Sequence, residues 1–164
     1  MNALLAQALL VLWAGTAAAY DWRFQRLPNW LTLGGLAVGA AYLLLAGAAP
    51  LGGDPLRNWM AAGVALLVLL PPYVFRWMGA GDVKFFVAMG LLGGAKVLLP
   101  AFFFGCLITG LWALAVVAAN RMALHWVSWR LTARLLVAPT RLPFGVGMAV
   151  GFVLSVLDIF HGLG

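Results

Sequence analysis

Long apolar stretches separated by short charged segments constrain this sequence more than any other feature. Hydrophobic residues make up 65% of the 164 residues, charged residues make up 9%, and glutamate is absent. Soluble domains carry about 25% charged residues, which form their solvated surface. A chain with so few charges cannot cover itself in this way, so its outer surface is expected to face lipid. The sequence therefore predicts an all-α integral membrane protein.

Six apolar runs approach the length of about 20 residues that a membrane-spanning helix needs. They cover residues 3–20, 30–49, 58–75, 83–98, 100–119 and 142–160. The fourth and fifth runs are separated only by Lys96–Pro100, where Pro100 and the preceding Gly93-Gly94 pair favour a break. We therefore expect a bundle of six transmembrane helices.

Two further features bear on the organisation of this bundle. The first run, Leu4–Ala19, has the apolar character of a signal peptide, but no Lys or Arg precedes Arg23, so we interpret it as a membrane helix. Glycines spaced four residues apart allow helix backbones to approach closely. They occur as the pairs Gly35 and Gly39, Gly90 and Gly94, and Gly147 and Gly151. Residues 1–164 are accordingly predicted to form one compact domain.

Basic residues divide unevenly between the two sides of the predicted bundle. The connections between spans 1–2, 3–4 and 5–6 hold eight of them: Arg23, Arg26, Arg76, Lys84, Arg121, Arg130, Arg134 and Arg141. The opposite side holds two, Arg57 and Lys96. Cytoplasmic loops carry an excess of Lys and Arg, so the larger set is predicted to be cytoplasmic and both termini to lie outside. This placement makes the net charge of +6 a topology signal, and no nucleic-acid partner is expected.

The longest connection, residues 120–141, has an amphipathic pattern. Large apolar residues (Trp126, Trp129, Leu131, Leu135, Leu136) alternate with basic ones (Arg121, His125, Arg130, Arg134). This pattern predicts an interfacial helix between spans 5 and 6, lying on the cytoplasmic leaflet. Its arginines could attract anionic lipid or the flanks of a substrate, and the interpretation as a lipid-anchored connector is favoured.

Two of the four aspartates stand at the ends of apolar runs on the predicted cytoplasmic side. These are Asp21 and Asp82; the others are Asp54 and Asp158. An ionisable group at the bilayer is costly and therefore suggests a functional site. Each aspartate also has a structural explanation, because Asp82 could cap a helix after a glycine turn and Asp21 could pair with Arg23 or Arg26. The two readings stay open for each residue taken alone.

Two carboxylates brought together cannot both ionise easily, so they share one proton. One can then take a proton from water while the other donates to a substrate carbonyl, which is the chemistry of aspartic proteolysis. No metal or cofactor is required. His125 is interpreted as an interfacial residue, Asp158 and His161 as a surface pair, and Cys106 as a buried structural thiol. The alternatives are a small proton- or cation-coupled transporter using Asp21 and Asp82, and a non-catalytic assembly subunit.

Two sequence motifs add to this reading. The segment Gly79-Ala80-Gly81-Asp82-Val83-Lys84 resembles the GxGD motif of intramembrane aspartic proteases, with the trailing lysine of type IV prepilin peptidases. Asp21, followed by Arg26-Leu27-Pro28-Asn29 and Thr32, is similar to the other aspartate segment of that family. The resemblance implies that Asp21 and Asp82 are the catalytic pair. It implies motif or supporting roles for six further residues: Gly79, Gly81, Lys84, Arg26, Pro28 and Asn29.

Members of this family cut the basic leader from prepilins or pilin-like precursors at the cytoplasmic face of the membrane. The resemblance therefore implies a prepilin substrate, a bacterial inner-membrane location and an active site toward the cytoplasm. The motif glycines are expected to let a substrate backbone lie alongside the site. Longer members carry paired Cys-x-x-Cys motifs and also methylate the new N-terminus, whereas this chain has one cysteine. We expect a peptidase without methyltransferase activity, resembling the short enzymes of Flp-type pili or the archaeal preflagellin peptidases, with the Flp type favoured.

Overall fold

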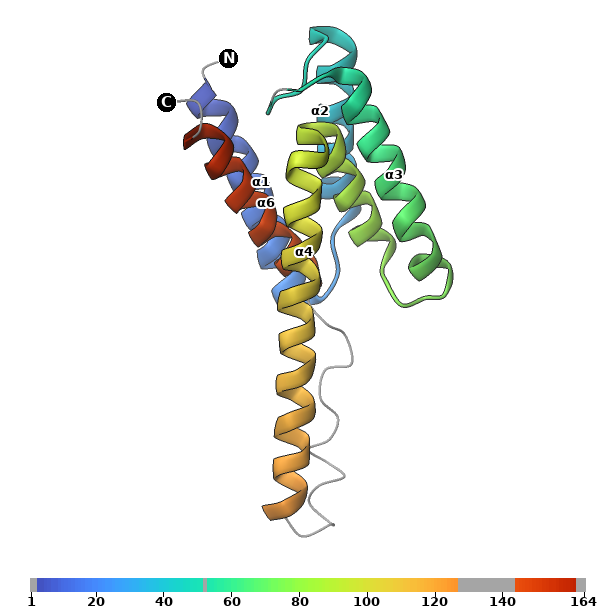
Figure 1. Ribbon diagram of the computed structural model, residues 1–164, viewed down its shortest axis with the longest axis vertical. Coiled ribbons are helices and arrows are strands. Elements are labelled where there is room, and N and C mark those ends of the chain that lie inside the picture. The colour runs from blue at the N-terminus through green and yellow to red at the C-terminus, as the bar shows by residue number, and fades with distance from the viewer. Residues whose placement is uncertain (1–2, 52, 127–143, 162–164) are drawn as a thin grey trace.

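Helices account for all the regular secondary structure in the part of the chain that the computed structural model describes, residues 3–51, 53–126 and 144–161. They are α1 (Ala3–Phe24), α2 (Asn29–Ala46), α3 (Pro55–Val74), α4 (Ala80–Trp126) and α6 (Phe144–His161). Helix α4 packs against α2, α3 and α6, while α1 packs against α6 (Figure 1). The prediction of an all-helical chain is confirmed for these residues, with α4 as the central element.

Helix α4 consists of two helical segments that meet at Gly94. This residue has φ 64° and ψ −156°, outside the helical region, and the chain reverses direction there (Figure 1). Glycine adopts such a conformation without the steric cost that a Cβ would bring. The predicted break between the fourth and fifth spans is present, but it lies at Gly94 rather than at Lys96–Pro100. Pro100 lies inside the second helical segment.

The break leaves carbonyl groups at the end of the first segment, and residues from outside α4 supply their partners. The side-chain amide of Asn58 donates to the carbonyl of Leu91 at 3.5 Å, and the backbone amide of Leu51 donates to the carbonyl of Leu92 at 3.3 Å. Terminal carbonyls of a helix need such partners because the helix offers none. Asn58 is buried in α3, so this end of α3 is fixed to the break.

Each of the six predicted spans overlaps a described helical segment, but the bounds differ, and residues 95–98 of the fourth predicted span lie beyond the break at Gly94. Helix α4 continues to Trp126, past the predicted end at residue 119, so the start of the predicted interfacial helix is an extension of α4. The remainder of that predicted helix, residues 127–141, lies outside the described residues. By length and composition, the ranges Asn29–Ala46 and Ala80–Ala118 could cross a membrane, and the second of them contains the reversal at Gly94.

Close contacts at glycines hold α6 against the second segment of α4. A Cβ added at Gly151 would lie 2.6 Å from the Pro100 carbonyl oxygen and 2.7 Å from the Cα of Ala101. A Cβ added at Gly147 would lie 2.8 Å from the Cα of Gly105. The close backbone approach that the glycine spacing predicts is therefore present at this pair.

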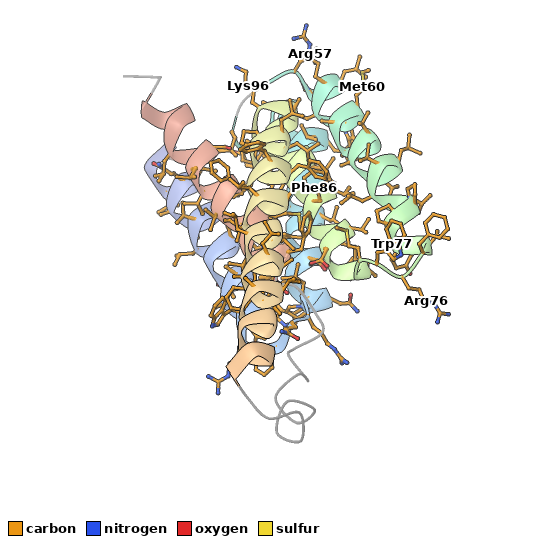
Figure 2. All side chains as sticks on the ribbon, turned by 60° about the horizontal axis from the view of Figure 1, so that its bottom comes forward. Arg57, Met60, Arg76, Trp77, Phe86 and Lys96 are labelled. Atoms are coloured by element: carbon orange, nitrogen blue, oxygen red, sulfur yellow. The ribbon has the colours of Figure 1, made fainter. Side chains whose placement is uncertain are left out.

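Charged side chains lie at the two ends of the bundle, and its sides are apolar. Arg57 and Lys96 lie at one end, whereas Arg76 lies at the other (Figure 2). Helices α1 and α4 bring Asp21 and Asp82 toward the second end, which we call the aspartate end (Figure 1). Many large apolar side chains point outward between the ends, including Leu45, which is 88% exposed. Such a surface is suited to lipid rather than water.

Candidate active site

Asp21 lies in the last turn of α1 and is held by the first turn of α6. Its side chain is buried, with 4% of the residue exposed. Its Oδ2 accepts a hydrogen bond of 3.0 Å from the backbone amide of Val146, and the amide of Gly145 adds a second, weaker one. The first amides of a helix have no partner within it and carry partial positive charge. Among the described residues, these amides rather than Arg23 or Arg26 are the polar partners of the carboxylate.

Asp82 is the third residue of α4 and caps its own helix. Its Oδ2 accepts a hydrogen bond of 3.3 Å from the backbone amide of Gly79, while the carbonyl of Gly79 accepts one of 3.1 Å from the amide of Asp82. In a capping box, the side chain of the third helical residue accepts a hydrogen bond from the amide of the residue before the helix, and the Asp82 side chain makes this bond to Gly79. The structural explanation of Asp82 as a helix cap is therefore confirmed, and the carboxylate remains half-buried.

The structure brings the two predicted aspartates together. The carboxylates of Asp21 and Asp82 lie close enough for the charge of one to act on the other. A contact at Gly81 explains how α4 reaches this position: a Cβ added there would lie 2.9 Å from the Cβ of Leu27 and 3.0 Å from its carbonyl oxygen. Any larger residue at position 81 would move the start of α4 away from the α1–α2 connection. In this structure Gly81 thus serves a contact within the chain itself.

The second motif forms the start of α2 and is linked to the first by one hydrogen bond. Pro28 is the N-cap residue of α2, and its carbonyl accepts from the amides of Leu31 at 3.1 Å and Thr32 at 3.2 Å. Helix α2 therefore begins at Asn29, one residue before the predicted span 30–49. The Nζ of Lys84 donates to the Oδ1 of Asn29 at 3.0 Å, so the two motif segments are joined beside the aspartates.

Other predicted residues lie away from this cluster. Arg26 is exposed. Asp54 caps α3, since its side chain accepts a hydrogen bond of 3.1 Å from the amide of Leu56. Its Oδ2 lies 3.8 Å from the Nε of Arg57, at the end of the bundle opposite Asp21 and Asp82. The side chains of His125, Asp158 and His161 lie outside the described part of the chain.

The prediction for Cys106 is wrong, because this thiol is exposed on α4. An apolar run predicts burial only where other protein elements surround it, and a lipid-facing surface accepts the same residue types. Within the described residues, no group of three or more His, Cys, Asp and Glu side chains could hold a metal ion.

Gly145 and Val146 were missed by the sequence reasoning. Their contribution is made by main-chain amides, which every residue except proline carries, so residue type gives no direct signal. The one local indication is Pro143 just before the helix, since proline is frequent at helix starts. Nothing in the local sequence says that this helix start faces Asp21, which lies 125 residues before Val146.

The arrangement has the parts needed for acid–base chemistry on a water molecule. Two carboxylates stand at helix ends within electrostatic range, and each is oriented by main-chain amides. A neutral carboxyl group can donate a proton while a neighbouring carboxylate accepts one.

Comparison with known proteins agrees with this arrangement. Residues 8–114, which include both aspartates, match the model of the type IV leader peptidase family. The chain is 30% identical over 146 residues to the prepilin leader peptidase/N-methyltransferase of Bacillus subtilis (strain 168), covering 85% of this chain and 50% of that protein. The chain thus spans about half the length of this relative. No solved structure gives a significant match.

Proposed function

The chain belongs to the type IV leader peptidase family, and on that premise we propose that it is an aspartic endopeptidase that removes the leader peptide of Flp-like prepilins. It is an integral membrane protein. The observation that supports the proposal is that the carboxylates of Asp21 on α1 and Asp82 on α4 lie within electrostatic range at one end of the bundle. A transporter would not require two carboxylates within electrostatic range of each other, each held by main-chain amides at a helix start.

In the proposed reaction the pair of aspartates holds one proton and acts on water. The ionised carboxylate removes a proton from the water molecule, whose oxygen attacks the carbonyl carbon of the scissile peptide. The protonated carboxyl group gives its proton to the carbonyl oxygen. The C–N bond then breaks as the leaving amine of the mature pilin takes up the proton that the first carboxylate received. The second carboxylate recovers its proton from a hydroxyl group of the intermediate as the new carboxyl group of the leader forms. Atoms and charge balance without a metal or a nucleophilic side chain.

The proposed orientation places the aspartate end in the cytoplasm and both termini on the other side of a bacterial inner membrane. Arg23 in the last turn of α1 and Arg26 and Arg76 in the connections belong to this end, whereas Arg57 and Lys96 lie at the opposite end (Figure 2). This distribution supports the orientation because positive charge is retained on the cytoplasmic side. A leader preceding a hydrophobic pilin helix would then meet the site at the membrane surface.

We propose peptidase activity without N-methylation of the product. The Bacillus subtilis relative is named for both activities, and this chain spans about half of its length. The single cysteine of the chain leaves no pair for the Cys-x-x-Cys motifs that accompany methylation in longer members. The mass of the new pilin N-terminus, measured after processing with S-adenosylmethionine present, would be that of an unmodified amine. A mass increase of one methyl group would contradict the proposal.

The direct test is co-expression with a tagged Flp-type prepilin, following the loss of the leader on a gel. Asp21→Asn and Asp82→Asn should each abolish cleavage while the proteins still accumulate in membranes. Asparagine retains an acceptor oxygen for the amides of Val146 and Gly79, so the helix ends stay capped. Asp54→Asn is the matched control, because Asp54 also caps a helix but lies at the other end. Cleavage that survives either active-site substitution would rule out the aspartate pair.

A further inference from the structure

The first turn of α6 contacts Asp21 through its main chain, and the proposed function gives this turn no role. The amide of Val146 donates to Oδ2 at 3.0 Å, and the amide of Gly145 donates to the same carboxylate. Gly145 also leaves the space that the carboxylate occupies. A Cβ added at Gly145 would lie 2.9 Å from Oδ2 and 3.0 Å from Cγ of Asp21. The turn therefore both binds the carboxylate and is shaped to admit it.

Burial disfavours the charged form of the Asp21 carboxylate, and the amides of Val146 and Gly145 oppose that effect. The ionisable residues of α6, Asp158 and His161, lie at the end of that helix far from its first turn, and α2 contains no Asp, Glu, Lys, Arg or His. On α4 the amine of Lys84 donates to Asn29, and Arg23 on α1 is exposed. The carboxylate of Asp82 lies within electrostatic range of Asp21. Hydrogen bonds donated to a carboxylate and the partial positive charge of a helix N-terminus both stabilise its ionised form.

The two aspartates differ in this respect. Asp21 receives two amides from a helix other than its own, the nearer at 3.0 Å. Asp82 receives the amide of Gly79 at 3.3 Å. When the pair holds a single proton, the carboxylate with the stronger donors keeps its charge and the other carries the proton.

We propose that the first turn of α6 is a positioning element of the active site, whose Gly145 and Val146 amides hold Asp21 ionised and directed toward Asp82. Asp21 is then the base that takes the proton from water, and Asp82 is the acid that protonates the carbonyl oxygen. This assignment rests on the proposed function. The pilin precursor would thus be cut at a site built from α1, α4 and α6 together.

The experiment uses two pairs of variants of the full chain, reconstituted in lipid vesicles with a purified Flp-type prepilin. Val146→Pro removes the donor at a first-turn position where proline is tolerated, whereas Val146→Ala keeps the amide. Gly145→Ala places a Cβ against the carboxylate, whereas Gly110→Ala adds one where no atom lies within 4 Å. The kcat, the KM and the pH dependence of kcat are measured for all four.

We expect Val146→Pro and Gly145→Ala to lower kcat about 10-fold to 100-fold, as loss of a hydrogen bond to a charged group predicts. The KM should change less than two-fold, and the acidic side of the pH profile should move to higher pH, because the ionised form of Asp21 has lost support. Val146→Ala, which keeps the amide donor, should retain a higher kcat than Val146→Pro, and Gly110→Ala should behave as wild type. A Val146→Pro enzyme with the kcat and pH profile of Val146→Ala would overturn the proposal. If Val146→Pro fails to accumulate, the test is the comparison of Gly145→Ala with Gly110→Ala, and equal kcat values and pH profiles for these two variants would overturn the proposal.

Failure of the proposed function gives a different result. A wild-type chain that cleaves no prepilin would refute the peptidase activity and leave the amide contact to be tested by unfolding. In a double-mutant cycle of Val146→Pro and Asp21→Ala, unfolding in detergent should show that each change costs less when the other is present. Additive effects would show that the turn does not hold Asp21.

Discussion

Replacing Gly81 by alanine should impair cleavage by moving Asp82 relative to Asp21. The added Cβ would lie 2.9 Å from the Cβ of Leu27 and 3.0 Å from its carbonyl oxygen. Neither atom can rotate away, because one is fixed to the backbone and the other is part of it. Carbon atoms normally pack at about 3.5–4.0 Å, so the start of α4 must retreat by about 0.6–1.1 Å.

A displacement of that size matters because the reaction depends on the placement of reacting groups. A misplacement of about 1 Å can cost about 100-fold in rate. Asp82 follows Gly81 directly in the first turn of α4, so it moves with the backbone. We therefore expect Gly81→Ala to lower kcat by about 10-fold to 100-fold while the protein still accumulates in membranes.

The assay is single-turnover cleavage of prepilin by the purified variant, with Gly34→Ala as the control. Gly34 is also a helical glycine, and an added Cβ there meets no atom within 4 Å. Both variants gain the same methyl group and the same helix propensity, so a difference between them reports the contact with Leu27. Equal cleavage rates for Gly81→Ala, Gly34→Ala and wild type would refute the reasoning.

Three further predictions concern contacts around the site and the helix packing. Lys84→Met and Asn29→Ala should each lower kcat/KM about 3-fold to 10-fold, because each removes one partner of the same hydrogen bond. In a double-mutant cycle of kcat/KM, the second substitution should add little to the first, and additive effects would contradict this prediction. Asn58→Leu should lower the free energy of unfolding by about 1–2 kcal/mol, since the carbonyl of Leu91 loses its donor at the break, and an unchanged thermal midpoint in detergent would count against it. Gly151→Ala should lower the free energy of unfolding by about 1–3 kcal/mol, because a Cβ there would lie 2.6 Å from a backbone oxygen of α4. Unfolding in SDS measures this free energy, and a wild-type value would show that the close contact between α6 and α4 does not contribute to stability.

The sequence predicts the fold correctly where one local signal acts alone. The prediction is wrong where two local signals compete. Apolar runs placed every described helix, because span length follows from composition alone. The break in α4 illustrates the limit. Glycine and proline both disfavour helix continuation, so Gly94 and Pro100 were both candidates for the break. The chain reverses at Gly94, whereas Pro100 lies inside the second helical segment. That choice depends on Asn58 and Leu51, which supply donors at Gly94 and come from elsewhere in the chain.

The two aspartates were predictable, but their partners were not. Asp21 and Asp82 stand out because ionisable residues are rare in such a sequence and because two motifs surround them. The expected arginine partners of Asp21 were the nearest in sequence. The partners found are amides of α6, and this pairing follows from the packing of α1 against α6 over a long separation. Main-chain donors leave no mark in a single sequence.

The helix-capping role of each aspartate is a condition for the proposed chemistry rather than an alternative to it. Asp82 is held by the amide of Gly79, and Asp21 by the amides of Gly145 and Val146. Neither carboxylate can rotate out of its position without breaking a hydrogen bond to a helix start. Retaining one proton between the two carboxylates therefore lowers their electrostatic repulsion without breaking these hydrogen bonds. This singly protonated state is the one that aspartic proteolysis requires. The packing of α1, α4 and α6 thus sets the protonation of the proposed site.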